Sequence, residues 1–115
     1  MVKPLENRDD LVNLLNSFYT KAQTDPLIGS KFDHINMDDH TQVITDFWDS
    51  ILFGTNSYQG DPFSKHIPLA LKIDDFDRWV SLFTETVDEQ FEGDKADEAK
   101  LRASTIARVF KAKLT

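Results

Sequence analysis

Apolar residues recur at spacings of three and four along almost the whole chain, and this helical period restricts the fold more than any other feature. A sustained stripe of this kind predicts a helix that buries one face. Four segments carry such a stripe. Their predicted inner faces are Leu11, Leu14, Leu15, Phe18, Tyr19 and Ala22; His40, Val43, Ile44, Phe47, Trp48, Ile51 and Leu52; Phe76, Trp79, Val80, Phe83 and Val87; and Ala99, Ala103, Ile106, Ala107 and Phe110. The sequence therefore predicts an all-α fold with four main helices.

Residues that start and stop helices lie at the ends of these segments. Asn7 can cap the first helix, with Asp10 as its partner in a short capping box. Either Asn36 or Asp38 can cap the second helix, and the third is predicted to begin near Asp74. The predicted stops are the Asp25-Pro26 pair, Gly54 and Gly93. No segment shows sustained strand alternation or a hairpin turn, so we predict no strand.

The length fits a single domain over residues 1–115. The chain contains no cysteine, which excludes disulfides and thiolate metal sites. Its net charge of −7 argues against nucleic acid and anionic membranes as partners, because both bind basic surfaces. No apolar run approaches the roughly 20 residues that span a bilayer, and the N-terminus lacks a signal-peptide core. We therefore expect a cytoplasmic protein.

The connection between the second and third helices, from Gly54 to Asp74, is long for a compact helical domain. It contains the stretch GDPFSKHIPLAL, residues 60–71, in which His66 lies among apolar residues. A neutral imidazole can ligate a metal, and surroundings poor in carboxylate suit a haem better than a hydrated ion. The alternative is a half-buried histidine that donates to a backbone carbonyl.

Three further polar groups stand on predicted inner faces. His40 is the only polar group on the stripe of the second helix, where it could donate to a bound ligand or reach solvent. Tyr19 and Trp79 each place one donor inward, and each is either an ordinary core residue or a donor to a ligand. His34 lies in a polar loop and is expected to be exposed. The spacing of the three histidines matches no helical zinc motif.

Taken together, these segments resemble those of the truncated haemoglobins, most specifically their third group. The matching pieces are FY at 18–19, DPLIGSKF at 25–32, H…I..FW..IL.G from His40 to Gly54, Y.G.P…H from Tyr58 to His66, F.RW..LF..T from Phe76 to Thr86, and F.G at 91–93 followed by A..IA..F to Phe110. They occur in order and cover nearly the whole chain.

The resemblance implies a two-over-two helical sandwich around a haem b, with His66 as the axial ligand of the iron. It also implies a set of residues around the haem. Tyr19, His40 and Trp79 would line the distal side, Phe32 would stack on the haem edge, Ile44 and Phe47 would wall the pocket, and Leu71 and Phe76 would contact the haem. Met37 and Val43 replace residues with which the family binds the haem rim and propionates, and Lys65 is a candidate substitute anchor.

The leading expectation is a haem protein that binds dioxygen, nitric oxide and carbon monoxide at a hydrogen-bonding pocket. Stabilised oxygen would suit redox chemistry, such as nitric oxide dioxygenation or peroxide handling, and turnover would then need a reductase partner. Two alternatives remain open. One is a haem-free four-helix interaction module whose aromatic residues are all core, and the other is a haem-based gas sensor.

Overall fold

The fold is known from a computed structural model, which describes residues 2–32, 36–55 and 72–114. Its elements are β1 (Lys3–Pro4), α1 (Arg8–Thr24), the 3-10 helix η1 (Gly29–Phe32), α2 (Met37–Phe53), α4 (Ile73–Gln90), β2 (Phe91–Glu92) and α5 (Asp94–Leu114). The predicted all-α class is confirmed. The long connection that contains Lys65, His66 and Leu71 lies outside the described residues, as does His34.

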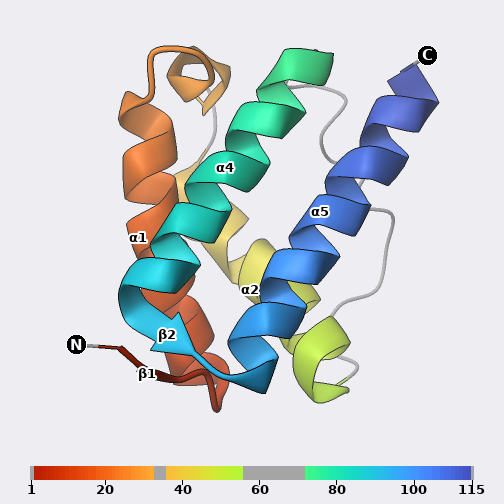
Figure 1. Ribbon diagram of the computed structural model, residues 1–115. Coiled ribbons are helices and arrows are strands. Elements are labelled where there is room, and N and C mark those ends of the chain that lie inside the picture. The colour runs from red at the N-terminus through yellow and green to blue at the C-terminus, as the bar shows by residue number, and fades with distance from the viewer. Residues whose placement is uncertain (1, 33–35, 56–71, 115) are drawn as a thin grey trace.

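The four α-helices in the described part of the chain pack as two pairs, two over two. Helix α1 contacts α2, and α4 contacts α5. The pairs meet where α4 packs on α1 and where α5 touches α2. Figure 1 shows α4 between α1 and α5, with α2 behind them. This arrangement lets α1, α2 and α4 all contribute side chains to one region of the interior.

Several of the predicted helix caps are present. The Asn7 side chain accepts the backbone N–H of Asp10 at 3.0 Å. The Asn36 side chain accepts the N–H groups of Asp38 and Asp39, so Asn36 and not Asp38 caps α2. Gly54 adopts a left-handed conformation (φ 69°) at the end of α2, which a residue without a Cβ tolerates best.

Helix α4 begins at Ile73, as the predicted start near Asp74 leads one to expect. Two local predictions differ from the structure. The carboxylate of Asp10 accepts the backbone N–H of Glu6 at 2.9 Å, so the predicted reciprocal bond to Asn7 is displaced by one residue. A two-residue parallel pair, β1 with β2, was not predicted, because so short a pairing leaves no alternation in the sequence.

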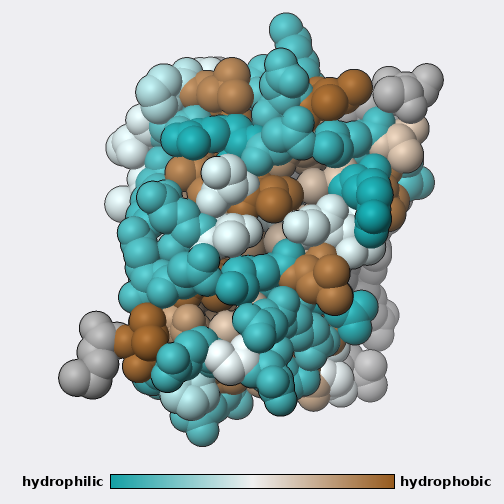
Figure 2. Space-filling model, viewed as in Figure 1, coloured by the Kyte–Doolittle hydropathy of each residue, from teal (hydrophilic) through white to brown (hydrophobic). Residues whose placement is uncertain are grey.

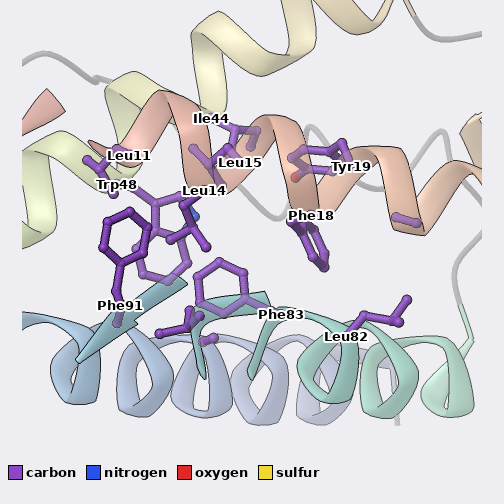
Figure 3. Close-up of a cluster of buried hydrophobic side chains, with 14 of the residues drawn as sticks. Leu11, Leu14, Leu15, Phe18, Tyr19, Ile44, Trp48, Leu82, Phe83 and Phe91 are labelled. Carbon is purple, nitrogen blue, oxygen red and sulfur yellow. The ribbon is translucent and has the colours of Figure 1, made fainter. Parts of the chain in front are cut away.

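The core lies between the two helix pairs and is largely aromatic. Phe83 of α4 is fully buried and stacks on Trp48 of α2, with ring centroids 5.0 Å apart and an interplanar angle of 13°. Phe18 of α1 meets Phe83 edge-on at 5.5 Å. Figure 3 shows Leu11, Leu14, Leu15 and Phe18 of α1 gathered on the side that faces Phe83. The predicted stripes of α1 and α4 therefore form the packed interface.

One face of the molecule is mainly hydrophilic in the space-filling view. Figure 2 shows one face of the molecule, where hydrophilic side chains predominate and hydrophobic ones lie scattered among them. Within the described ranges, no helix is long and apolar enough to cross a membrane.

Candidate functional site

Four side chains that the sequence singles out converge at the end of α1 that leads into η1. They come from different elements: Tyr19 from α1, Phe32 from η1, His40 from α2 and Trp79 from α4. The Tyr19 and His40 rings meet edge-on at 4.9 Å, and the Tyr19 and Phe32 rings at 5.8 Å. Phe32 and His40 lie 6.4 Å apart. The structure thus brings residues 19, 32, 40 and 79 into one cluster, called the donor cluster below.

Tyr19 is the central member of the donor cluster. It is only 3% exposed, and Trp79 packs against the core cluster to which Tyr19 belongs. Burial raises the pKa of Tyr19 well above its ordinary value. Tyr19 therefore stays protonated at neutral pH and keeps a hydrogen to donate.

His40 lies near the N-terminus of α2, where its backbone N–H donates to Asn36 O at 2.9 Å. The residue is half-buried, and its ring stands almost perpendicular to that of Tyr19, at 88°. The Nε2 atom is shielded from solvent. Of the two orientations that the sequence left open, the imidazole thus adopts one that turns Nε2 inward.

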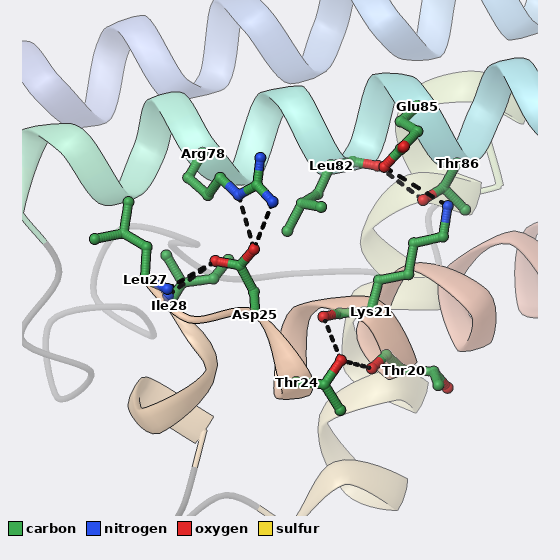
Figure 4. Close-up of polar contacts among 10 residues, drawn as sticks. All are labelled: Thr20, Lys21, Thr24, Asp25, Leu27, Ile28, Arg78, Leu82, Glu85 and Thr86. Carbon is green, nitrogen blue, oxygen red and sulfur yellow. Dashed lines mark hydrogen bonds and ion pairs between the residues drawn. The ribbon is translucent and has the colours of Figure 1, made fainter.

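A tight corner over residues 25–32 delivers Phe32 to the donor cluster. Gly29 lies so close to the end of α1 that a Cβ placed there would come within 2.6 Å of Gln23 O. Asp25 folds the chain back, because its Oδ2 accepts the backbone N–H groups of Leu27 at 3.0 Å and Ile28 at 3.2 Å. Asp25 is the first residue after α1, and Figure 4 shows its carboxylate between the corner and α4.

The other residues that the sequence predicts to contact the haem are only partly in the same core as this cluster. Ile44 is buried, and Phe47 is half-buried against the main core. Phe76 belongs to a smaller cluster, where its ring meets that of Phe110 at 5.5 Å. Trp79 packs against both clusters. The roles predicted for Lys65, His66 and Leu71 remain predictions, because these three residues lie outside the part of the chain that the structure describes.

Sequence reasoning missed one polar contact next to the site. Asp25 and Arg78 form an ion pair, with Arg78 Nη2 2.7 Å and Nε 2.8 Å from Asp25 Oδ1. Both residues stand in the motifs quoted above, DPLIGSKF and F.RW, but 53 positions separate them. The only sign of this ion pair in the sequence is that Asp25 lies at the end of a predicted helix and is followed closely by the apolar residues Leu27 and Ile28.

The donor cluster combines hydrogen-bond donors with aromatic rings and contains no Asp, Glu, Lys or Arg. Such a site can hold a flat apolar group and donate to a small polar ligand. Across the residues with described positions, no group of three or more His, Asp or Glu side chains could hold a metal ion by itself. The chemistry of the described donors is therefore that of hydrogen bonding to a ligand.

Comparison with known proteins supports the same interpretation. The model of the bacterial-like globin family matches residues 6–111 of this chain. A group 3 truncated haemoglobin of Campylobacter jejuni, ctb, is 27% identical over 111 residues, which is 90% of this chain and 87% of that protein. The crystal structure of group III truncated haemoglobin from Campylobacter jejuni matches with a TM-score of 0.89 and 26% identity, over 100% of this chain and 96% of that one. The resemblance and the fold predicted from it are confirmed.

Proposed function

Because this chain belongs to the bacterial-like globin family, we propose that it binds haem b and takes up diatomic gases beside the donor cluster. A haem supplies an iron with one coordination position for a protein ligand and one for a gas. The proposed protein ligand is His66, which the family resemblance implies. Dioxygen, nitric oxide and carbon monoxide are the proposed gases.

The residues of the donor cluster fit such a group. Tyr19 is buried, and Tyr19, His40 and Trp79 each carry a group that can donate a hydrogen bond. Phe32, Ile44 and Phe47 surround these groups with apolar and aromatic surface, as a flat apolar cofactor requires. Lys65, Leu71 and Phe76 are the other proposed contacts.

The buried Tyr19 between His40 and Phe32 is the observation that carries the proposal. Its ring meets those of His40 at 4.9 Å and Phe32 at 5.8 Å, and the residue is only 3% exposed. Burial raises its pKa, so the hydroxyl keeps a hydrogen that a ligand can accept. A gas whose outer atom carries partial negative charge would accept from Tyr19 and would leave slowly.

Slow release of oxygen favours redox use over bulk transport. We infer that nitric oxide dioxygenation or peroxide handling is the activity to look for, with a reductase partner that supplies electrons. Tyr19 and His40 would hold the ligand, and the aromatic residues around them would limit the entry of water.

The variant Tyr19→Phe tests this function, because it keeps the ring and removes only the hydroxyl. One net hydrogen bond is worth about 1 kcal/mol, so we expect oxygen to dissociate roughly five- to tenfold faster, measured by stopped-flow. Carbon monoxide, a poorer acceptor, should leave at a nearly unchanged rate. Trp79→Phe should act in the same direction, while Trp48→Phe, which alters a core indole elsewhere, is the control. Unchanged oxygen release in both Tyr19→Phe and Trp79→Phe would contradict the proposal.

A further inference from the structure

The corner over residues 25–32 determines where Phe32 lies. Phe32 is the last residue of the corner and ends η1. Its side chain is almost fully buried, and its ring centroid lies 5.8 Å from that of Tyr19 and 6.4 Å from that of His40. A movement of the corner would therefore displace the Phe32 ring within the donor cluster.

Two ion pairs of opposite polarity join the corner to the first turns of α4. At the start of the corner, Asp25 Oδ1 lies 2.7 Å from Arg78 Nη2 and 2.8 Å from its Nε (Figure 4). Near the other end of the corner, Lys31 Nζ lies 3.8 Å from Asp75 Oδ2. Both carboxylates are almost fully buried, since only 2% of the Asp25 side chain and 4% of the Asp75 side chain are exposed. The corner is thus attached to α4 at both of its ends.

The order of the charges favours one register of the corner on α4. Asp75 and Arg78 are three positions apart on this helix, so they lie on the same face of it. A shift of the corner by one helical turn would bring Asp25 towards Asp75 in one direction. In the other direction it would bring Lys31 towards Arg78. Both contacts join like charges and are repulsive, so the crossed pairs favour the observed position.

Asp75 is held in its place on α4 by bonds that do not involve the corner. It is the third residue of the helix, its Oδ2 accepts the backbone N–H of Lys72 at 2.8 Å, and its own N–H donates to Lys72 O at 3.0 Å. A buried carboxylate is costly unless it is both paired and hydrogen-bonded. Lys72 supplies a hydrogen bond, and Lys31, the residue next to Phe32, supplies the opposite charge. A change at Asp75 therefore acts on the corner from another helix, through Lys31.

We propose that Asp25 and Asp75 are positioning residues, which fix the corner to α4 and thereby hold the Phe32 ring in the donor cluster. Each carboxylate acts through the position of Phe32, the residue proposed to stack on the haem edge. This inference deepens the proposed function and rests on it only for the measurement of haem loss. The alternative is that the two ion pairs contribute to stability alone.

The chain offers a matched control for that alternative. Asp10 is also the third residue of its helix, its carboxylate accepts the backbone N–H of Glu6 at 2.9 Å, and Lys3 Nζ lies 2.6 Å from it. Its side chain is 5% exposed, which is close to the value for Asp75. Figure 1 shows the start of α1 at the end of the molecule opposite to the corner. The variant Asp10→Asn therefore removes a similar buried ion pair far from Phe32.

The first measurement is hydrogen exchange of the native protein, followed by NMR with any haem kept in its diamagnetic carbon monoxide form. The reporters are the backbone N–H groups of Gly29 and Lys31, which donate to carbonyl groups inside the corner. Their exchange rates are compared with those of the slowest amides of the core, which report global unfolding. In Asp75→Asn and Asp25→Asn, we expect this ratio to rise roughly fivefold, the factor for one net hydrogen bond. The nuclear Overhauser effects from the Phe32 ring to the other rings of the donor cluster should weaken in the same variants.

Asp75→Asn is the decisive variant, because it leaves the sequence of the corner unchanged and its amide oxygen can still accept from Lys72. In Asp10→Asn, the ratio and the Phe32 signals should stay as they are in the native protein. If Asp75→Asn does not fold, Lys31→Met replaces it and should raise the ratio in the same way.

An unchanged ratio with unchanged Phe32 signals, in Asp75→Asn or in the variant that replaces it, overturns the proposal and leaves a role in stability alone. A protein without haem would leave this measurement intact, so failure of the proposed function is recognised separately.

The second measurement is a double-mutant cycle on haem loss from the haem-loaded protein, followed by transfer of haemin to apomyoglobin. Asp75→Asn should speed haem loss by no more than Phe32→Leu does. It should have no further effect when it is combined with Phe32→Leu, because the carboxylate acts through the ring. Equal acceleration by Asp75→Asn with and without the Phe32 ring would show that Asp75 does not act through Phe32, and it would overturn the proposal.

Discussion

Tyr19 and Trp79 are two donors that the sequence predicts on inward faces of different helices. The structure buries Tyr19 at 3% exposure and packs the half-buried Trp79 against the core cluster that contains it. The effects of removing the two donors on oxygen release need not add, because both can share one ligand atom.

His40 is expected to control ligand entry. The variant His40→Leu separates this role from cofactor binding. The half-buried ring covers one side of Tyr19 from the N-terminal end of α2. We expect His40→Leu to change the association rate of carbon monoxide by roughly tenfold, about 1.4 kcal/mol in the barrier, and to leave haem retention nearly unchanged. Flash photolysis gives the rate, and transfer of haem to apomyoglobin gives retention. Loss of haem as severe as in His66→Ala would contradict this role and would make His40 an iron ligand.

At the scale of the elements, the sequence correctly predicts the features that depend on local interactions. The helical stripes, the Asn7 and Asn36 caps and the left-handed Gly54 all depend on residues within a few positions of each other. The parallel contact of Lys3 with Phe91 and the bond of Arg78 to Asp25 depend on segments 88 and 53 residues apart. Nothing in the local pattern specifies such partners, because only the packed helices bring them together.

The link between the corner and α4 also makes a pH-dependent contribution to stability. The hydrogen bond from Arg78 holds the pKa of Asp25 below its ordinary value of 3.8, although burial opposes this effect. A carboxyl group with a lowered pKa stabilises the folded state only while it is ionised. Its contribution is complete well above pH 3.8 and disappears as the pH falls through the lower folded-state value.

We therefore expect the native protein to exceed Asp25→Asn in free energy of unfolding at neutral pH, with a difference that shrinks below about pH 4. Urea unfolding at a series of pH values measures it. Asp77→Asn is the control, since Asp77 is 60% exposed and its pair with Lys111 should contribute little at any pH. A difference between the native protein and Asp25→Asn that does not vary with pH would rule out this linkage.

At the scale of the whole molecule, the two-over-two packing explains why one site draws on three helices and a corner. Helix α1 touches both α2 and α4, so Tyr19 can meet His40 while Trp79 packs against the same core. Periodicity predicts that these residues face inward but not that they meet. The family resemblance predicts that these residues converge, because it implies how the helices pack against each other. The periodicity of the sequence does not contain that information.

The central claim is that this fold holds a haem through His66. Haem binds the folded state only, so a bound haem should also raise the melting temperature by mass action. The direct test is a haemin titration followed by the Soret absorbance, on the native protein and on His66→Ala, with His34→Ala as the matched control. We predict one haemin per chain and a sharp Soret band for the native protein and His34→Ala, and greatly weakened binding for His66→Ala. A native protein that stays colourless and develops no Soret band would contradict haem binding and favour a haem-free interaction module, while normal binding by His66→Ala would contradict the axial ligand.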